Sequence, residues 1–240
     1  GITGYWMEEA ASKTASQPKF RQLNLKLRKV AALVYATDEL LEDAAALQSW
    51  IMNTVPLELK FKIEDAIVNG NGVGMPLGIL SSPALVTFAR VDTSEVDATD
   101  IGLMWGRRFA GYNDYVWLAN QSIFGQLMNL AIGNQPVFLG AGGLSGLPYA
   151  TLLGRPLYES EYSPALGDIG DLLLVSPSAY QMIEKSGGVQ AASSIHVAFT
   201  TDQQVFRFVY RIDGAPSWMS ALTCNDSTTR SPFVALTSSS

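Results

Sequence analysis

The sequence contains only one cysteine and one histidine in 240 residues. Cys224 alone cannot form an internal disulfide, and Cys224 with His196 is too small a set for a zinc site. His196 lies in the alternating run 195–199, which predicts a strand with the histidine on its polar face. Catalysis by a Ser-His-Asp or Cys-His arrangement is therefore not favoured. We expect no cofactor, no metal and no catalytic residue.

Long hydrophobic runs are also missing. No stretch reaches the ~18 consecutive apolar residues that a membrane helix requires, and the chain does not open with a basic-then-apolar secretory signal. With 48% hydrophobic and 16% charged residues, the composition is typical of a folded, soluble protein of one or two domains. The carboxylates Glu159, Glu161, Asp168 and Asp171 are interpreted as solvated loop residues rather than as a catalytic pair.

Positive charge is scarce except at the start of the chain. The formal net charge of −6 argues against a dedicated nucleic-acid binder. Residues 1–36 nevertheless carry six basic residues against Glu8 and Glu9, or +4, so residues 37–240 hold 10 basic and 20 acidic residues, or −10. A basic arm thus precedes an acidic body.

The arm is predicted to form a hairpin. Residues 20–30 alternate apolar and basic side chains, which predicts a half-exposed strand, and residues 5–8 would pair with it across a loop at 9–18. A two-stranded ribbon is marginal in water, so this one should lie either on the acidic body of another copy or on its own domain. The candidate inter-subunit contacts are Tyr5, Trp6, Lys13, Lys19, Arg21, Lys26, Arg28 and Lys29.

A long helix follows the arm. Thr37 is the candidate N-cap before an acidic first turn, and Pro56 should kink or break the helix. Gly70 should end it as a left-handed C-cap. The glycine-rich residues 70–78 close a helix and lack a Gly-Lys-Ser/Thr ending, so they predict a turn and not a phosphate loop. The apolar stripe comprises Leu47, Ile51, Val55, Leu59, Ile63 and Ile67.

The second half of the chain mixes both kinds of element. Apolar periodicity predicts helices at 101–109, 123–130 and 177–183, and strands at 115–118 and 171–175. Interleaved helices and strands place the chain in the α+β or α/β class.

Four motifs stand in order along the chain. The first is Thr37-Asp-Glu-Leu-Leu-Glu-Asp43 before a long helix, and the second is Asn69-Gly-Asn-Gly72 followed by residues 76–80. Residues 152–160 and 197–214 supply the other two. Together the motifs resemble the major capsid protein family of tailed bacteriophages, which has the Hong-Kong-97-type fold, and the resemblance extends from about Phe20 to Gly214. Their order and spacing together are specific, although each motif alone is weak.

The resemblance implies an α+β fold in four parts. Residues 1–36 would be the N-arm and extended hairpin loop, and residues 37–97 the first part of the peripheral domain with its spine helix. Residues 98–194 would form the axial domain, and residues 195–240 the returning strands of the peripheral domain.

The resemblance also implies a function. The chain would be a major capsid protein that assembles into the icosahedral head shell around double-stranded DNA. Its partners would be other copies in pentamers and hexamers, a portal, and decoration or scaffolding proteins, with only weak contacts to the packaged DNA. It would be assembled in the host cytoplasm and reside in the virion, without membrane contact. The alternative is an encapsulin-like nanocompartment shell that encloses enzymes.

Three finer expectations depend on the same resemblance. Gly1 would be a terminus produced by a protease. Lys13 and Asn225 are of the residue types that join subunits covalently in some members, although no Glu follows Glu184 to assist them. A glycine-rich loop would either close the ring at a symmetry axis or be a solvent-exposed turn; its glycines are Gly140, Gly142, Gly143 and Gly146.

Overall fold

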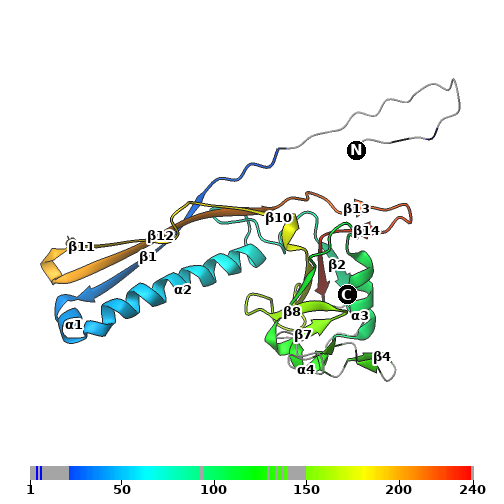
Figure 1. Cartoon of the computed structure of the whole chain (residues 1–240), viewed down its shortest axis with the longest axis horizontal. Coiled ribbons are helices and arrows are strands. Elements are labelled where there is room, and N and C mark those ends of the chain that lie inside the picture. The colour runs from blue at the N-terminus through cyan, green and yellow to red at the C-terminus, as the bar shows by residue number, and fades with distance from the viewer. Residues whose placement is uncertain are drawn as a thin grey trace.

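The computed structural model describes Gly4, Trp6 and residues 22–91, 95–128, 130–132, 135–136, 138–139 and 150–238. Figure 1 shows an elongated lobe, formed by a sheet lying against a long helix, that projects from a globular lobe. Helices and strands interleave along the chain, so the predicted α+β class is confirmed.

The elongated lobe is built around one long strand, β12 (Gln203–Pro216). Strand β1 (Arg28–Thr37) pairs with it on one side, and β10 (Tyr180–Glu184) and β11 (Gln190–Ala198) pair with other parts of it, all antiparallel. Beneath the sheet lies α2 (Ala45–Asn69). Buried side chains that alternate along the strands pack against this helix; they include Ala36, Phe206 and Phe208, which meet Ile51 and Leu59.

The predicted hairpin strand differs from the observed one. Of the described residues in the predicted range, 22–30, only 28–30 are in a strand, and β1 pairs with β12 in the register Arg28 to Ile212. The reason is that apolar alternation continues through Val30, Ala32, Val34 and Ala36, which face α2. Apart from Trp6, the proposed partner segment lies outside the described residues.

The predicted single helix is two helices. Helix α1 (Asp38–Asp43) ends at Ala44, whose φ of −118° and ψ of 75° are not helical, and α2 then runs uninterrupted through Pro56. Thr37 stands at the N-cap but its side chain makes no capping hydrogen bond.

Gly70 is not the predicted left-handed cap, because its φ is −58° and its ψ is 143°. Glycine is needed there for space: a Cβ would lie 2.2 Å from the Pro76 carbonyl oxygen and 2.3 Å from that of Ala66. The predicted turn at 70–78 is present, with Gly72 and Gly74 at positive φ and Asn71 bridged to Leu77.

The globular lobe contains a seven-stranded sheet in the order β2-β15-β9-β3-β8-β7-β6. Strand β9 (Leu172–Val175), which lies between β15 and β3, is buried at every position. Helix α3 (Ala98–Arg107) and the short η1 (Gln121–Ile123) and α4 (Phe124–Leu127) contribute to its larger apolar cluster, around Trp117. The other strands are β2 (Val86–Ala89), β3 (Val116–Ala119), β6 (Phe138–Leu139), β7 (Ala150–Leu152), β8 (Arg155–Glu159) and β15 (Phe233–Thr237).

Most predicted elements of this lobe are present. The helix at 101–109 corresponds to α3, which Asp97 and Asp100 start with a capping box, and the two strands correspond to β3 and β9. The helix predicted at 123–130 is confined to η1 and α4. The helix at 177–183 is wrong: after η2 (Pro177–Ala179) the chain becomes β10, because Tyr180 to Glu184 pair with the end of β12.

Strand pairing crosses the four predicted segments. Strands β2 and β15, from 37–97 and 195–240, lie in one sheet with β3, β8 and β9, whereas β10, from 98–194, and β11, which crosses the boundary at 194, pair with β12. Two small ribbons complete the fold: β4 (Ala131–Ile132) with β5 (Gln135–Pro136), and β13 (Leu222–Thr223) with β14 (Thr229–Arg230). Among the described helices none is long and apolar enough to cross a membrane.

Candidate assembly surface

The arm leaves the elongated lobe at a fixed point. The backbone N–H of Lys26 donates a 2.7 Å hydrogen bond to the carboxylate of Asp213, which is only 7% exposed. Asp213 also accepts a hydrogen bond from the Gly214 N–H. Beside this contact is a cleft of about 530 Å³ whose lining includes Leu23 and Met75. Residues 22–26 are therefore held against the end of β12. This contact fixes the point at which the arm leaves the elongated lobe.

The sheet face that points away from α2 is open. Along β1, residues Lys29, Ala31, Leu33 and Tyr35 are exposed while their neighbours are partly or fully buried. Leu33 and Tyr35 are 57% and 55% exposed, which is unusual for large apolar side chains that stand next to one another on a strand face. Val209 lies opposite Ala31 and completes an apolar patch, defined here as Leu33, Tyr35 and Val209.

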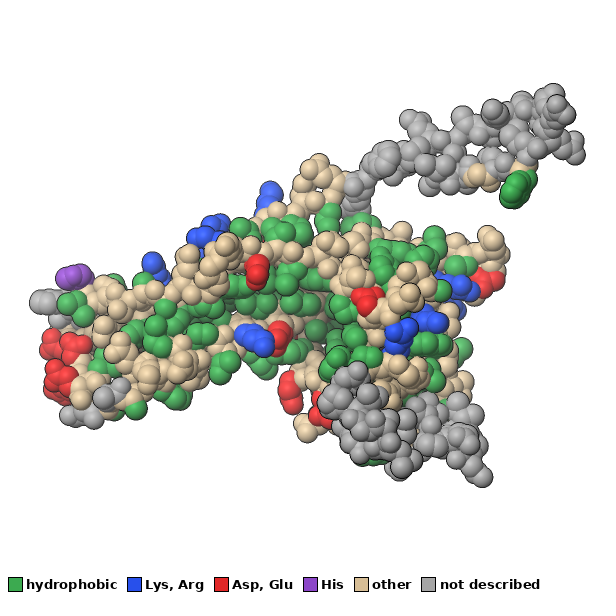
Figure 2. Space-filling model, in the orientation of Figure 1, with side chains coloured by type: hydrophobic (Ala, Val, Ile, Leu, Met, Phe, Trp, Pro, Cys, Tyr) green, Lys and Arg blue, Asp and Glu red, His purple; other side chains and the backbone are tan. Residues whose placement is uncertain are grey.

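Three cations lie side by side on this face. Lys29 pairs directly with Arg211 across β1 and β12, and the Lys185 N–H donates to the Arg211 carbonyl on the other side. We call Lys29, Arg211 and Lys185 the cationic row; all three are exposed. The ion pairs found among the described residues involve none of them. Figure 2 shows Lys and Arg side chains projecting from the upper edge of the elongated lobe, on its sheet side.

The far tip of the same lobe is acidic. Helix α1 presents Asp38, Glu39 and Glu42, which are exposed, and Figure 2 shows Asp and Glu side chains gathered at this end. Acidic residues in the first turn are favourable because they face the positive end of the helix dipole. The lobe therefore carries opposite charges on its open sheet face and at its tip.

The helix side of the lobe is also apolar. Trp50, Leu57 and Phe61 of α2 are 60%, 65% and 42% exposed. Between α2 and the sheet is a groove of about 470 Å³ whose lining includes Leu57, Met182 and Ile212. Both faces of the lobe thus expose large apolar side chains, as expected for a subunit whose surface is covered in an assembly.

A brace joins the two lobes. The Tyr162 hydroxyl donates a hydrogen bond to the carboxylate of Glu64 on α2, and its ring lies 4.9 Å from that of Phe61. Asn69 donates a 2.8 Å hydrogen bond to the Tyr162 carbonyl. The hydrogen bond to Glu64 raises the pKa of Tyr162 to about 12, since the carboxylate favours the protonated phenol. These contacts hold α2 against the globular lobe together with Val68, which packs in the apolar cluster around Leu173 and Val175.

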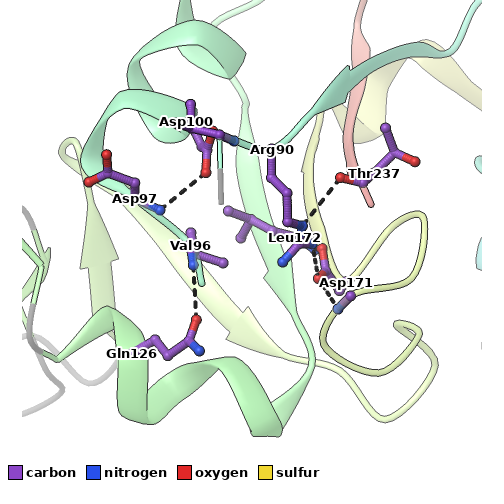
Figure 3. A network of polar contacts seen from close by, with 10 residues as sticks. Arg90, Val96, Asp97, Asp100, Gln126, Asp171, Leu172 and Thr237 are labelled. Carbon is purple, nitrogen blue, oxygen red and sulfur yellow. Dashed lines mark hydrogen bonds and ion pairs between the residues drawn. The ribbon is translucent and has the colours of Figure 1, made fainter. Parts of the chain in front are cut away.

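The strongest charge cluster of the globular lobe is internal (Figure 3). Arg90 and Asp171 form an ion pair with no exposed side-chain surface. Arg90 also donates to the Thr237 carbonyl, and Asp171 accepts from the backbone N–H groups of Gly167 and Leu172. The expectation that Asp171 is a solvated loop residue is therefore wrong. The network ties β2, β9 and β15 together, which is a structural role.

The described residues contain no group of three or more His, Cys, Asp or Glu side chains that could hold a metal ion. Cys224 is a free thiol. His196 is exposed on β11 as predicted, but Ile195 and Val197 are exposed as well, so the predicted alternation of polar and buried faces is absent there. Asn225 is exposed in the turn between β13 and β14.

The predicted contact residues are distributed unevenly. Lys26 lies at the root of the arm, Arg28 faces the helix side of β1, Lys29 faces the open side, and Trp6 is fully exposed. Sequence reasoning missed Arg211 and Lys185 as partners of Lys29, since only the strand register brings them together. Tyr5, Lys13, Lys19, Arg21, Gly140, Gly142, Gly143 and Gly146 lie outside the described residues.

Solved structures similar to this fold include a particle capsid, a phage structure and an encapsulin complex. The capsid of the empty GTA particle, computed with C5 symmetry, superposes with a TM-score of 0.77 at 19% identity, over 100% of this chain and 82% of that one. A structure from Mycobacterium phage Adephagia gives 0.61 at 13% identity, over 98% and 81%. The SrpI encapsulin complex from Synechococcus elongatus gives 0.60 at 15%, over 88% and 73%. The fold is of the Hong-Kong-97 type, as the resemblance implied.

The sequence comparisons agree with the fold. No curated protein matches the chain. The model of the phage capsid family matches residues 1–224, which is most of the 240 residues. Together with exposed apolar faces on a lobe built for contact, this match identifies a structural protein of the virion shell. The chain belongs to the phage capsid family, and it is a major capsid protein.

Proposed function

We propose that this major capsid protein assembles, through pentamers and hexamers, into the icosahedral head shell that encloses double-stranded DNA. The observation that carries the proposal is the pair of apolar faces on the elongated lobe, with Leu33 and Tyr35 on one side and Trp50 and Leu57 on the other. Exposed apolar surface of this extent is stabilised when neighbouring copies cover it. Closed rings of one chain need such heterologous contacts.

We further propose a division of labour between the lobes. The elongated lobe, with α2 as its spine, corresponds to the peripheral domain, and the globular lobe corresponds to the axial domain. Residues 1–27 would extend onto neighbouring copies, with the predicted contact residues on that arm and on β1. The glycine-rich loop with Gly140, Gly142, Gly143 and Gly146 would lie at the ring axis.

The remaining partners are proposals from the family. A portal, scaffolding or decoration proteins, and packaged DNA would contact the assembled shell, which would form in the host cytoplasm. The net charge of −6 favours weak DNA contacts, because a wall that bound phosphates tightly would hinder packaging and release. Weak binding of a DNA duplex by free subunits at ~0.15 M salt is the expected result, and tight binding would contradict it.

Electron microscopy of the purified chain tests the proposal directly. Uniform icosahedral particles are expected, whereas discrete small oligomers at all concentrations would refute it. Denaturing electrophoresis of intact particles tests the covalent link between Lys13 and Asn225, since linked subunits would migrate as ladders above the 25.9 kDa chain.

The alternative is a nanocompartment shell. The fold similarity to the SrpI encapsulin complex, with a TM-score of 0.60, is the observation in its favour. The contents of particles purified from their natural source distinguish the two: DNA supports the phage head, and an enclosed enzyme supports the compartment.

A further inference from the structure

We propose that the open sheet face binds the segment 6–9 of a second copy of this chain, with Glu8 on the cationic row, Glu9 beside it and Trp6 on the apolar patch. The inference rests on the proposed function, because it requires that copies assemble. It deepens that function by naming the surface and the segment that meet. In this contact the arm segment is acidic and the face is basic, which is the opposite of the expectation that a basic arm lies on an acidic body.

The first step is the electrostatic cost of the cationic row in a single chain. Lys29 and Arg211 are directly opposite in the β1–β12 pair, and Lys185 is adjacent to Arg211 on the other side. Like charges directly opposite across strands are about 5 Å apart at Cβ and destabilise a sheet. Arg207, exposed four residues along β12 from Arg211, adds a further cation to the same face. An anionic partner would remove this repulsion.

The second step is that the chain's own described carboxylates do not supply that partner. On this side of β12 the acidic residue is Asp213, which is buried and already accepts hydrogen bonds from Lys26 and Gly214. Glu184 lines the groove on the helix side, where it accepts a hydrogen bond from Tyr210. The face therefore remains cationic and open in the isolated chain.

The third step is a match of spacing. Glu8 and Glu9 are the acidic residues of the first 36 positions, and they follow Trp6 by two and three residues. In an extended strand two residues span about 7 Å. Val209 of the apolar patch is likewise two residues from Arg211 along β12. An extended segment projects Trp6 and Glu8 to the same side, so Trp6 can lie over the patch while the Glu8 carboxylate reaches the cationic row, and Glu9 adds negative charge beside it. Trp6 is fully exposed in the isolated chain, so it gains from being covered.

The fourth step is the choice of a second copy. Gln22 is thirteen positions after Glu9, with twelve residues between them, enough to span about 45 Å when extended. The root of the arm at Lys26 lies beside its own cationic row, so binding in the same chain would require the arm to fold back sharply. Binding to the next copy needs no such turn and is heterologous, which generates rings. The acidic tip at Asp38 and Glu39 is a weaker competitor, because the α1 dipole already stabilises it.

Charge reversal tests the contact in the whole chain. K29E/R211E and, separately, E8R/E9R should each lower the yield of particles ~10-fold or more, since close charge pairs across interfaces are strongly coupled. The combination of all four substitutions should restore the yield. K60E/K62E on α2 changes the charge equally and serves as the matched control, which E8R/E9R should not rescue. Normal assembly of K29E/R211E, or no recovery in the combination, would overturn the inference.

Cross-linking then identifies which copies meet. In a C224S background, chains with E8C and chains with R211C are mixed and assembled under mild oxidation. Disulfide-linked dimers are expected from the mixture, and particles of either variant alone should yield none. A link formed within one chain carrying both cysteines, without dimers, would overturn the choice of a second copy. Circular dichroism confirms that each variant is folded.

The outcomes separate this inference from the proposed function. If the unaltered chain forms no particles, the proposed function fails. If particles form but neither substitution matters, only the inference fails. Rescue of K29E/R211E by D38K/E39K would assign the face to the acidic tip. If K29E/R211E forms normal particles with reduced DNA content, the open sheet face binds DNA. Either of these two results would overturn the proposal.

Discussion

Arg90 and Asp171 form an ion pair whose two side chains are both completely buried. The pair links the end of β2 to the residue before β9, and the Arg90 guanidinium also reaches the β15 carbonyl of Thr237. One nitrogen of Arg90, Nη1, is buried without a hydrogen-bond partner among the described residues. The charge is therefore compensated almost entirely by one carboxylate.

Removing one member of this pair should strongly destabilise the globular lobe. We expect Arg90→Met or Asp171→Asn to lower the free energy of unfolding by about 3–5 kcal/mol, because the remaining group stays buried and unpaired. The double variant should lose less free energy of unfolding than the two single variants lose together. Urea unfolding measures these changes. Arg230→Ala, which removes the partly exposed pair with Asp226, is the control and should cost at most ~1 kcal/mol.

Two glycine-to-alanine substitutions should have opposite effects. Gly70→Ala would place a Cβ 2.2 Å from a backbone oxygen, so the helix end must shift and stability must fall. Gly102 lies inside α3, and a Cβ there meets nothing within 4 Å, so Gly102→Ala should stabilise by about 0.5–1 kcal/mol. Thermal unfolding of both variants checks the prediction. Equal effects would contradict the steric reason given for Gly70.

The brace between the lobes can be tested at Tyr162. Tyr162→Ala removes the ring contact with Phe61 and the hydrogen bond to Glu64, so the lobes should vary more in relative orientation. Small-angle scattering of the unassembled chain should show a wider distribution of dimensions, and hydrogen exchange should rise near Asn69. Tyr162→Phe keeps the ring and is the control. An unchanged distribution for the alanine variant would show that other contacts hold the lobes.

High pH should destabilise the protein through a buried phenol. Burial raises the pKa of Tyr115 to about 12, and its hydroxyl donates a 2.8 Å hydrogen bond to the Phe109 carbonyl. The folded pKa lies above the ordinary value of 10.0, so the fold favours the neutral form. Its stabilisation is complete below pH ~10 and is lost as the pH rises towards ~12. Tyr115→Phe should cost ~1 kcal/mol at neutral pH and weaken the loss at high pH, as measured by unfolding across this range.

Local sequence patterns predicted most of the helices and strands but few of the pairings between strands. The buried strand β9 and helix α3 are visible in the sequence because an apolar run and helical apolar spacing determine them locally. The strand β10 was missed because Pro177 and the apolar spacing after it favour a helix, and only pairing with β12 overrides that preference. Tertiary contacts of this kind have no signal in a short window of sequence.

The candidate surface shows the same limit. The basic residues Lys26, Arg28 and Lys29 were recognised by type, but the alternation of β1 sends Arg28 and Lys29 to opposite faces. Arg211 lies far along the chain and becomes the neighbour of Lys29 only through the β1–β12 register. Counting charges in the sequence therefore identified the basic residue types, but strand pairing in the sheet determines which of these residues lie next to one another.

Strand β12 is shared by β1, β10 and β11, and its side chains alternate between the α2 side and the open face. Inserting a single residue near Phe208 would turn every later side chain over, placing Arg211 inside and Ile212 in water. Related chains should therefore lengthen or shorten this strand in steps of two residues. Odd insertions should survive only where a bulge absorbs them.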